Sequence, residues 1–126
     1  MTNWEYTETE LWRYNHNDIS IMHVFSVVSF EGNVLAFCEA RYGDGSDAGA
    51  PHDIYMKKST DGGKTFEDNR VLFDCKGALC YVNPTPLYDK INSRLYLFYA
   101  INLGNTKTEN YYIYSDDCGE SWSEPR

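Results

Sequence analysis

Residues 41–53 are the part of the sequence richest in side chains that can do chemistry. They read RYGDGSDAGAPHD and combine one arginine, one histidine and three aspartates with three glycines and a proline. Elaborated loops on a rigid scaffold are where binding and catalysis tend to occur, although this composition also suits a plain surface insertion. The aspartates lack the spacing of an EF-hand calcium loop. The glycines fit a GxGxxA pattern after a strand, but Pro51 and a further strand follow where dinucleotide binding requires a helix.

Composition limits what such a loop can bind. The chain has 126 residues, with 11 basic and 19 acidic side chains and a net charge of −8. This length has room for one domain, and the acidic balance argues against nucleic acid or a membrane as partner. Aromatic residues make up 16% of the chain, which is enough for a packed core and too many for a disordered segment. The first ten residues do not resemble a signal peptide, so the localisation is cytoplasmic by default.

The cysteine pattern does not predict a metal site. No CxxC pair occurs among the four cysteines, so zinc is not expected, and neither is any other metal or cofactor. Cys38 lies in an apolar, strand-like run, which suits a buried free thiol. Cys75 and Cys80 would form a disulfide only in an oxidising compartment.

The hydrophobic pattern predicts strands along most of the chain. No window shows the 3.6-residue stripe of a helix. The segment 4–14 alternates between apolar and polar residues and predicts one strand. The other predicted strands are short, rich in β-branched and aromatic residues, and bounded by Gly, Asn, Asp or Pro; they cover 22–30, 33–40, 53–58, 82–88, 94–102 and 110–114. The fold class is therefore all-β.

One octapeptide pattern occurs twice. Residues 59–66 read STDGGKTF and residues 115–122 read SDDCGESW, so both fit Ser-x-Asp-x-Gly-x-(Ser/Thr)-aromatic at an offset of 56. Upstream segments repeat as well, since NVLAF at 33–37 resembles RLYLF at 94–98. A period near 50 residues with about four strands per unit is typical of β-propeller blades.

The octapeptide resembles the Asp box of sialidases and other propeller proteins. The resemblance implies a hairpin turn in which Asp and Ser/Thr side chains cap backbone N–H groups, while the last aromatic residue packs into the core. The residue types suit such a turn, because Asp and Ser side chains accept hydrogen bonds from nearby backbone N–H groups and Gly adopts a positive φ. Asp61, Asp117, Phe66 and Trp122 are therefore expected to be structural.

Strand order predicts which loops share an end of the sheet. The tight turn at 31–33 joins the first two strands, which puts loop 42–52 at the opposite end. His23 and Arg41 share that end with the loop. The same reasoning places Asn83 there in the second unit.

The stretch 22–66 resembles the N-terminal part of the sialidase (neuraminidase) catalytic propeller. Members of that family have an Arg-Ile-Pro segment, a glycine turn, a strand ending in a Glu-Ala-Arg-like element and a loop with a catalytic aspartate. Here Glu39-Ala40-Arg41 and Asp47 fit this order, and VNPTPLYD at 82–89 resembles the second blade. The resemblance implies that residues 1–126 are a partial domain, about two four-stranded antiparallel blades of a six-bladed propeller.

The resemblance also implies roles for individual residues. Asp47 would be the acid/base that protonates the glycosidic oxygen, and Arg41 would lie beside the substrate carboxylate, with His23 and Asn83 as further substrate contacts. A general acid needs a carboxyl group whose pKa is raised by burial under the sugar. A guanidinium holds a carboxylate in a bidentate fork. The tyrosine nucleophile of sialidases and its glutamate partner are expected outside this sequence.

One position departs from the family pattern. His23-Val24-Phe25 stands where the family has Arg-Ile-Pro, so a histidine replaces the first carboxylate-binding arginine. A histidine is mostly neutral at pH 7 and cannot make a bidentate charge pair. His23 either bonds a hydroxyl of another sugar or is a satisfied core residue, and its shared end with Asp47 favours the first. His52 is either a second polar wall of the loop or a solvated turn residue, and the second is expected.

Two functions remain open. The resemblance implies a retaining glycoside hydrolase of the exo-α-sialidase type, which removes terminal sialic acid or a related acidic sugar from glycans; the present segment alone is expected to be inactive. The alternative is a non-catalytic carbohydrate-binding Asp-box propeller, which the histidine at position 23 favours. In that case, three copies of the chain are a plausible way to complete a six-bladed ring, because two blades alone leave edges exposed. Both functions have a glycan as partner.

Overall fold

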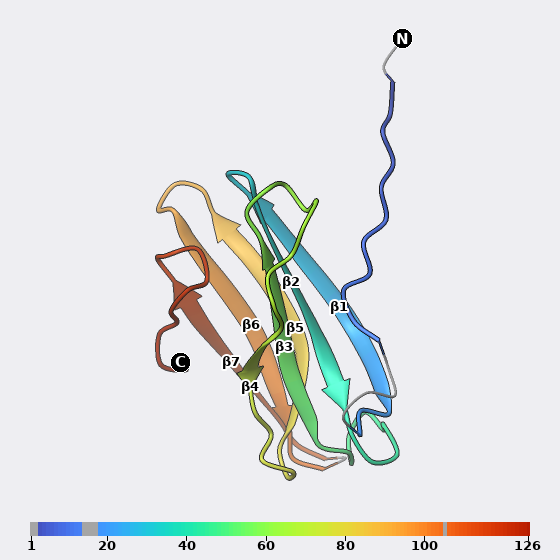
Figure 1. Ribbon diagram of the computed structural model, residues 1–126. Coiled ribbons are helices and arrows are strands. Elements are labelled where there is room, and N and C mark those ends of the chain that lie inside the picture. Colours follow the sequence, from blue (N-terminus) through green and yellow to red (C-terminus); the bar gives the residue numbers. More distant parts are fainter. Residues whose placement is uncertain (1–2, 14–17, 105) are drawn as a thin grey trace.

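The computed structural model describes residues 3–13, 18–104 and 106–126 (Figure 1). These residues confirm the all-β prediction, and they include no helix that is long and apolar enough to cross a membrane. The strands are β1 (Ile21–Phe30), β2 (Asn33–Arg41), β3 (His52–Ser59), β4 (Arg70–Phe73), β5 (Cys80–Asp89), β6 (Arg94–Asn102) and β7 (Thr108–Ser115).

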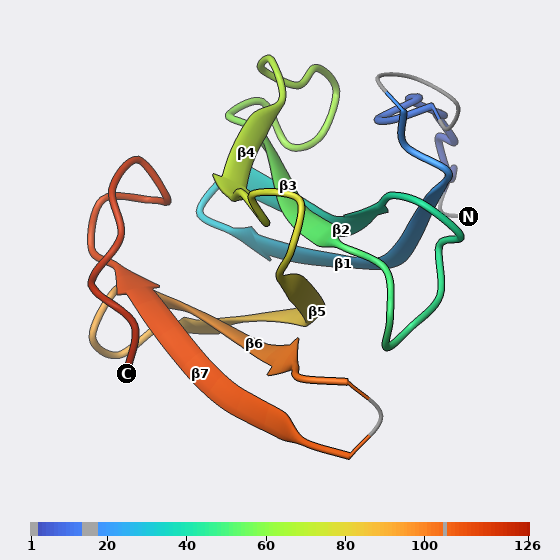
Figure 2. The ribbon, with the colours of Figure 1, turned by 90° about the horizontal axis from the view of Figure 1, so that it is seen from below.

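The strands form two antiparallel units. In the first unit β1, β2, β3 and β4 pair in chain order, and in the second unit β5, β6 and β7 do the same. A single parallel pair, His52 with Cys80, links β3 to β5. The end-on view in Figure 2 shows the two units as two twisted parts of one seven-stranded sheet. In the described part of the chain β1 and β7 do not pair with each other, so the sheet is open.

Two strand predictions need correction. The predicted strand at 4–14 is absent over residues 4–13, which are mostly exposed, and residue 14 lies outside the described residues. Alternation alone does not make a strand there, because no neighbouring strand supplies backbone partners. Conversely, the prediction missed β4, whose four residues RVLF are too few to show a period.

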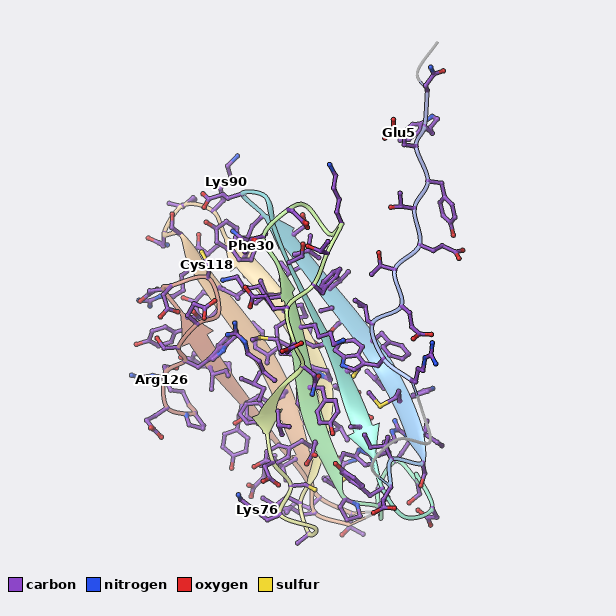
Figure 3. The ribbon with its side chains drawn as sticks, in the orientation of Figure 1. Glu5, Phe30, Lys76, Lys90, Cys118 and Arg126 are labelled. Carbon is purple, nitrogen blue, oxygen red and sulfur yellow. The ribbon has the colours of Figure 1, made fainter. Side chains whose placement is uncertain are left out.

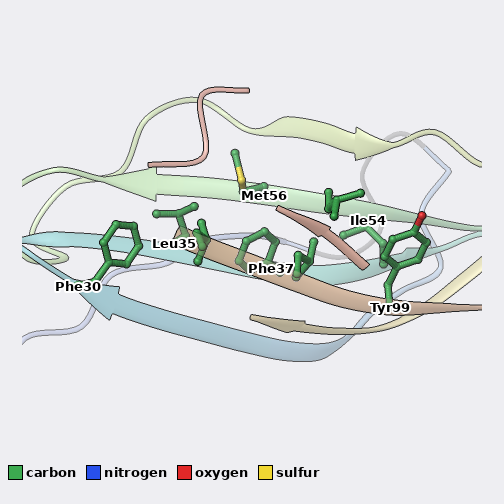
Figure 4. Close-up of a cluster of buried hydrophobic side chains, with 9 residues drawn as sticks. Phe30, Leu35, Phe37, Ile54, Met56 and Tyr99 are labelled. Atoms are coloured by element: carbon green, nitrogen blue, oxygen red, sulfur yellow. The ribbon is translucent and has the colours of Figure 1, made fainter. Parts of the chain in front are cut away.

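The hydrophobic core lies between the two units (Figure 4). Its members are apolar side chains with almost no exposed surface; they are Phe30, Leu35, Phe37, Ile54, Met56, Leu95, Leu97, Tyr99 and Ile113. Trp122 packs against this cluster, and its ring meets that of Phe37 edge-on at a centroid distance of 6.4 Å. Burying a side chain of this size contributes roughly 1.5–3 kcal/mol. The contact between the units therefore supplies much of the hydrophobic stabilisation.

The two octapeptides form the same turn. In the first, Asp61 accepts hydrogen bonds from the Ser59 hydroxyl and from both the backbone N–H and the hydroxyl of Thr65, while Ser59 Oγ accepts one from the Gly63 N–H. The same bonds recur around Asp117. Figure 3 shows Cys118 of the second turn at the same end as Phe30, which ends β1, and opposite Lys76. The turns and the β1–β2 connection thus share one end of the molecule.

The repeat continues beyond the turns. The Glu67 N–H donates to the Lys58 carbonyl, and in the second unit the Ser123 N–H donates to Tyr114. Arg126 then exchanges two backbone hydrogen bonds with Tyr112, both of 3.0 Å, at the position where β4 pairs with β3 in the first unit. The two units therefore keep one register over their last strands and turns.

The turn aspartates predict a defined loss of stability in acid. Hydrogen bonds from Ser121, with one from Ser115, lower the pKa of Asp117 from 3.8 to about 2, and those from Thr65 lower the pKa of Asp61 as well. Their contribution to stability is therefore present above the unfolded pKa and is lost as pH falls through the folded one. In D117N, urea unfolding should show a smaller loss of free energy between pH 4 and pH 2. The control D68N, at an exposed acid, should keep the wild-type profile; equal profiles for both variants would contradict this assignment.

Two equivalent turn glycines should differ in their tolerance of alanine. Gly63 and Gly119 have φ of +93° and +83°, a region that costs an L-residue roughly 1–2 kcal/mol. A Cβ at Gly119 would lie 2.6 Å from Leu35 Cδ2 in the core, whereas at Gly63 the nearest atom, on Val34, is 3.6 Å away. Overpacking adds about 1–3 kcal/mol. Urea unfolding should therefore show a loss of about 2–5 kcal/mol for G119A and of only about 1–2 kcal/mol for G63A. Equal losses would mean that the Leu35 side chain moves aside without cost.

Candidate functional site

A pocket of about 380 Å³ opens where the first strands of the two units approach each other. Its lining residues come from β1, β2, β5, β6 and the loop after β2; they are His23, Val24, Glu39, Arg41, Asp47, Val82, Asn83 and Asn102. All four residues that the sequence singled out, namely His23, Arg41, Asp47 and Asn83, therefore line one pocket. Sequence reasoning did not single out Asn102, and it treated Glu39 only as part of a motif.

Both first strands lose their regular pairing beside this pocket. The register shifts between residues 23 and 26 in β1 and between 82 and 85 in β5. Within these bulges Val24 has φ of 48° and Asn83 has φ of 58°, which is uncommon for non-glycine residues and an outlier for valine. Bulges re-aim side chains, and strained backbone clusters at binding and catalytic sites. The bulges thus explain how His23 and Asn83 both come to line the pocket.

The guanidinium of Arg41 lies at the centre of the site, with only 7% of its side chain exposed. Its Nε donates to Glu39 Oε2 over 2.8 Å, and Nη2 lies 2.6 Å from the same oxygen. Its Nη1 lies 2.6 Å from Asp47 Oδ1 and donates to the Gly45 carbonyl. Nη2 also lies 3.3 Å from His23 Nδ1, and because arginine only donates, that ring nitrogen accepts. All three guanidinium nitrogens are therefore engaged.

The two carboxylates around Arg41 differ in exposure. The Glu39 side chain is 1% exposed, and its second oxygen accepts the Asn83 backbone N–H over 2.8 Å. The Asp47 side chain is 84% exposed. Glu39 is thus a fixed, buried partner of the arginine, whereas Asp47 is open to a ligand.

Side chains from three strands hold the backbone around Asp47. Asn102 Nδ2 donates to the Asp47 carbonyl over 2.8 Å, and the Cys80 thiol donates to the same oxygen over 3.4 Å. His52 Nε2 lies 2.9 Å from the Ser46 carbonyl and acts as donor there. His52 is fully buried, so its prediction as a solvated turn residue is wrong: β3 begins at His52 and carries the ring beneath the loop.

The cysteines are free thiols in the structure. Cys38 is fully buried, as the sequence predicts, and burial raises the pKa of its thiol. Cys75 and Cys80 are also buried and form no disulfide with each other. Burial raises the pKa of Cys75 to about 11, with a further increase from Asp53 beside it.

Asp53, Asp74 and Cys75 bring three potential metal-binding atoms within 4.8 Å of one another. The Asp53 carboxylate is already occupied, since Oδ2 accepts from the Tyr42 hydroxyl over 2.6 Å and Oδ1 accepts from the Cys75 N–H over 2.8 Å. The high pKa of the Cys75 thiol disfavours the thiolate that a metal requires. We therefore assign this group a role in anchoring the β4–β5 connection.

Comparison with known proteins gives similarity at the level of fold. No family model matches the sequence, and no curated protein matches it. Among solved structures, the chain is similar to the Hadza microbial sialidase Hz136, with a TM-score of 0.73 and 21% identity over 87% of this chain and 26% of that one. It is also similar to a mutant of Trypanosoma rangeli sialidase displaying trans-sialidase activity, with a TM-score of 0.63 and 17% identity over 86% of this chain and 20% of that one. The fold is therefore sialidase-like, and the chain spans about a quarter or less of these structures.

Proposed function

We propose that this chain forms one side of the substrate pocket of a sialidase-like glycoside hydrolase of the exo-α-sialidase type, which removes terminal sialic acid or a related acidic sugar from glycans. The observation that carries the proposal is that the exposed Asp47 carboxylate lies in one pocket with Arg41, His23 and Asn83. The sialidase-like fold supports it.

In this proposal Asp47 is the acid/base. It donates a proton to the glycosidic oxygen as the bond to the anomeric carbon breaks, and in the second step it takes a proton from the attacking water. Arg41 and Glu39 fix the position of the Asp47 carboxylate through the guanidinium. The nucleophilic tyrosine and its glutamate partner come from outside these 126 residues, so the segment alone is inactive.

The proposal includes a propeller. The two units are then two blades of a six-bladed ring, and the two octapeptides are Asp boxes. The register that both units share over their last strands supports this, as does the open sheet with its unpaired outer strands. Because the blades of a propeller repeat radially around a central channel, further blades would complete the pocket.

A second candidate is a non-catalytic carbohydrate-binding propeller. The charge balance favours it: Glu39 and Asp47 outweigh Arg41, and His23 accepts a hydrogen bond through a neutral ring nitrogen. Among the described pocket-lining residues, no cation is left to bind a sugar carboxylate. Such a site would take a sugar through its hydroxyl groups. Under either function the partner is a glycan, and neither nucleic acid nor a membrane is a partner.

Sugar binding tests both candidates. Titration of the ¹⁵N-labelled chain with methyl α-N-acetylneuraminide and with methyl β-galactoside should shift the backbone amides of His23, Arg41 and Asn83. Losing one hydrogen bond to a sugar corresponds to roughly tenfold in affinity, so N83A should weaken binding about tenfold. The control N110A changes an exposed asparagine on β7 and should bind as the wild type. Shifts confined to other regions, or none with either sugar, would refute the pocket assignment.

A further inference from the structure

A row of paired residues crosses both units at the end of the sheet where the Asp47 loop lies. Each residue of the row is the cross-strand partner of the next, from β2 through β3, β5 and β6 to β7; the residues are Arg41, His52, Cys80, Asn102 and Thr108. We call it the paired row. β2 and β6 both end at it, at the lower end of Figure 1. Residues directly opposite each other on neighbouring strands lie on one face of a sheet, so these side chains are neighbours.

The paired row holds Asp47 from both units. From the first unit, Arg41 Nη1 lies 2.6 Å from the Asp47 carboxylate. From the second unit, Asn102 Nδ2 donates to the Asp47 carbonyl over 2.8 Å, and the Cys80 thiol donates to the same oxygen over 3.4 Å. A thiol is a weak donor. The Asn102 amide is therefore the stronger of the two tethers on the Asp47 carbonyl.

Thr108 orients the amide of Asn102. An asparagine side chain can present either its oxygen or its NH₂ group to a neighbour. The Thr108 hydroxyl donates to Asn102 Oδ1 over 3.0 Å, which leaves Nδ2 to face the Asp47 carbonyl. Thr108 itself is exposed and is not among the residues that line the pocket. Its influence on the site is therefore expected to pass through Asn102.

The loop needs such a tether because its own sequence makes it pliable. Glycines occupy positions 43, 45 and 49, and the first two have positive φ values. Glycine loses more conformational freedom on ordering than any other residue. The Asp47 side chain is 84% exposed, so core packing does not fix it. A shift of 1 Å in a reacting group can cost about 100-fold in rate.

We propose that Asn102 is a positioning residue for the acid/base Asp47. Its amide, oriented by Thr108, fixes the backbone at residue 47, so that Arg41 holds the carboxylate where it can protonate the glycosidic oxygen. Asn102 acts through Asp47 and transfers no proton itself. The inference rests on the proposed function and adds that the second unit takes part in the acid/base step.

Kinetics of the intact protein that contains this sequence tests the role of Asn102. N102A should lower kcat on sialyllactose about tenfold, the equivalent of one hydrogen bond, and should leave KM nearly unchanged. The loss should be smaller on an aryl α-sialoside, because a phenol needs less help from an acid. The matched control N110A, at an exposed asparagine on β7, should behave as the wild type. A raised KM with unchanged kcat would indicate a direct sugar contact and would overturn the proposal.

Thr108 gives a test that removes no atom from the pocket. T108V keeps the shape of the side chain but loses the hydroxyl, so kcat should fall about threefold, and T108S should restore it. In the N102A background T108V should cause no further loss, because the amide that it orients is gone. An equal effect of T108V with and without Asn102 would contradict the proposed role.

D47A separates a failure of this inference from a failure of the proposed function. Unchanged activity in D47A refutes the proposed function, whereas a large loss in D47A with none in N102A refutes only the positioning role. Hydrogen exchange of the intact protein, measured by mass spectrometry, tests the tether without activity. N102A and T108V should speed the exchange of amides in residues 43–50 and leave β2 and β3 unchanged. Unchanged exchange in the loop would overturn the proposal.

Discussion

Replacing Arg41 by methionine is expected to lower the free energy of unfolding by about 3–5 kcal/mol, because removing one member of a buried ion pair leaves the other charge unpaired. Glu39 is 1% exposed and is held by the Arg41 guanidinium at 2.6 Å. Without the arginine, its remaining contacts are the Asn83 N–H and the His52 ring at 3.6 Å. The negative charge of Glu39 then stays buried without a cation to balance it.

A double substitution separates this effect from simple loss of packing. In E39Q/R41M the buried charge is removed together with its partner, and replacing both members of a buried pair is often close to neutral. The double variant should therefore be more stable than R41M, which a double-mutant cycle in urea measures. As matched control, R94M breaks a partly exposed pair with Asp116, which solvent screens, and should lower the free energy of unfolding much less than R41M does. Equal losses for R41M and R94M would contradict the account of the site.

Much of the scaffold could be predicted because the responsible signals are local. Alternation, glycine turns and the repeated octapeptide depend on neighbouring residues, and the observed strands β2 and β6 begin where the pattern predicts. Strand direction then determines which ends meet, which is why His23, Arg41 and Asn83 line the same pocket. Residues 4–13 show the limit of the same reasoning, since alternation cannot supply a partner strand.

The charge environment of the site could not be predicted. Glu39 and Arg41 share a face of β2 because they are two residues apart, but the burial of that face under the second unit is a tertiary property. The burial of His52 depends on how the loop carrying Ser46 folds over the end of β3. The bulges at Val24 and Asn83 could not be recognised from the sequence, because the residues that adopt a positive φ there are not glycines. These features had to be seen in the structure.

Replacing Asp47 by alanine should have the largest effect on activity. A positioned general acid contributes about 10²–10⁴-fold in rate, so under the proposed function D47A should lose about that factor. The variant should still fold, because Glu39 remains as the buried partner of Arg41. The matched control is D44A in the same loop, whose carboxylate is hydrogen-bonded locally, to Ser46. D44A should keep nearly full activity.

Hydrolysis of sialyllactose and of an aryl α-sialoside by the intact protein that contains this sequence tests the central claim most directly. A sugar alcohol is a poorer leaving group than a phenol and needs the acid more. The account predicts that D47A loses activity on both substrates and loses more on sialyllactose, while D44A loses little on either. Unchanged hydrolysis by D47A, on these substrates and on a panel of neutral aryl glycosides, would show that Asp47 is not the acid.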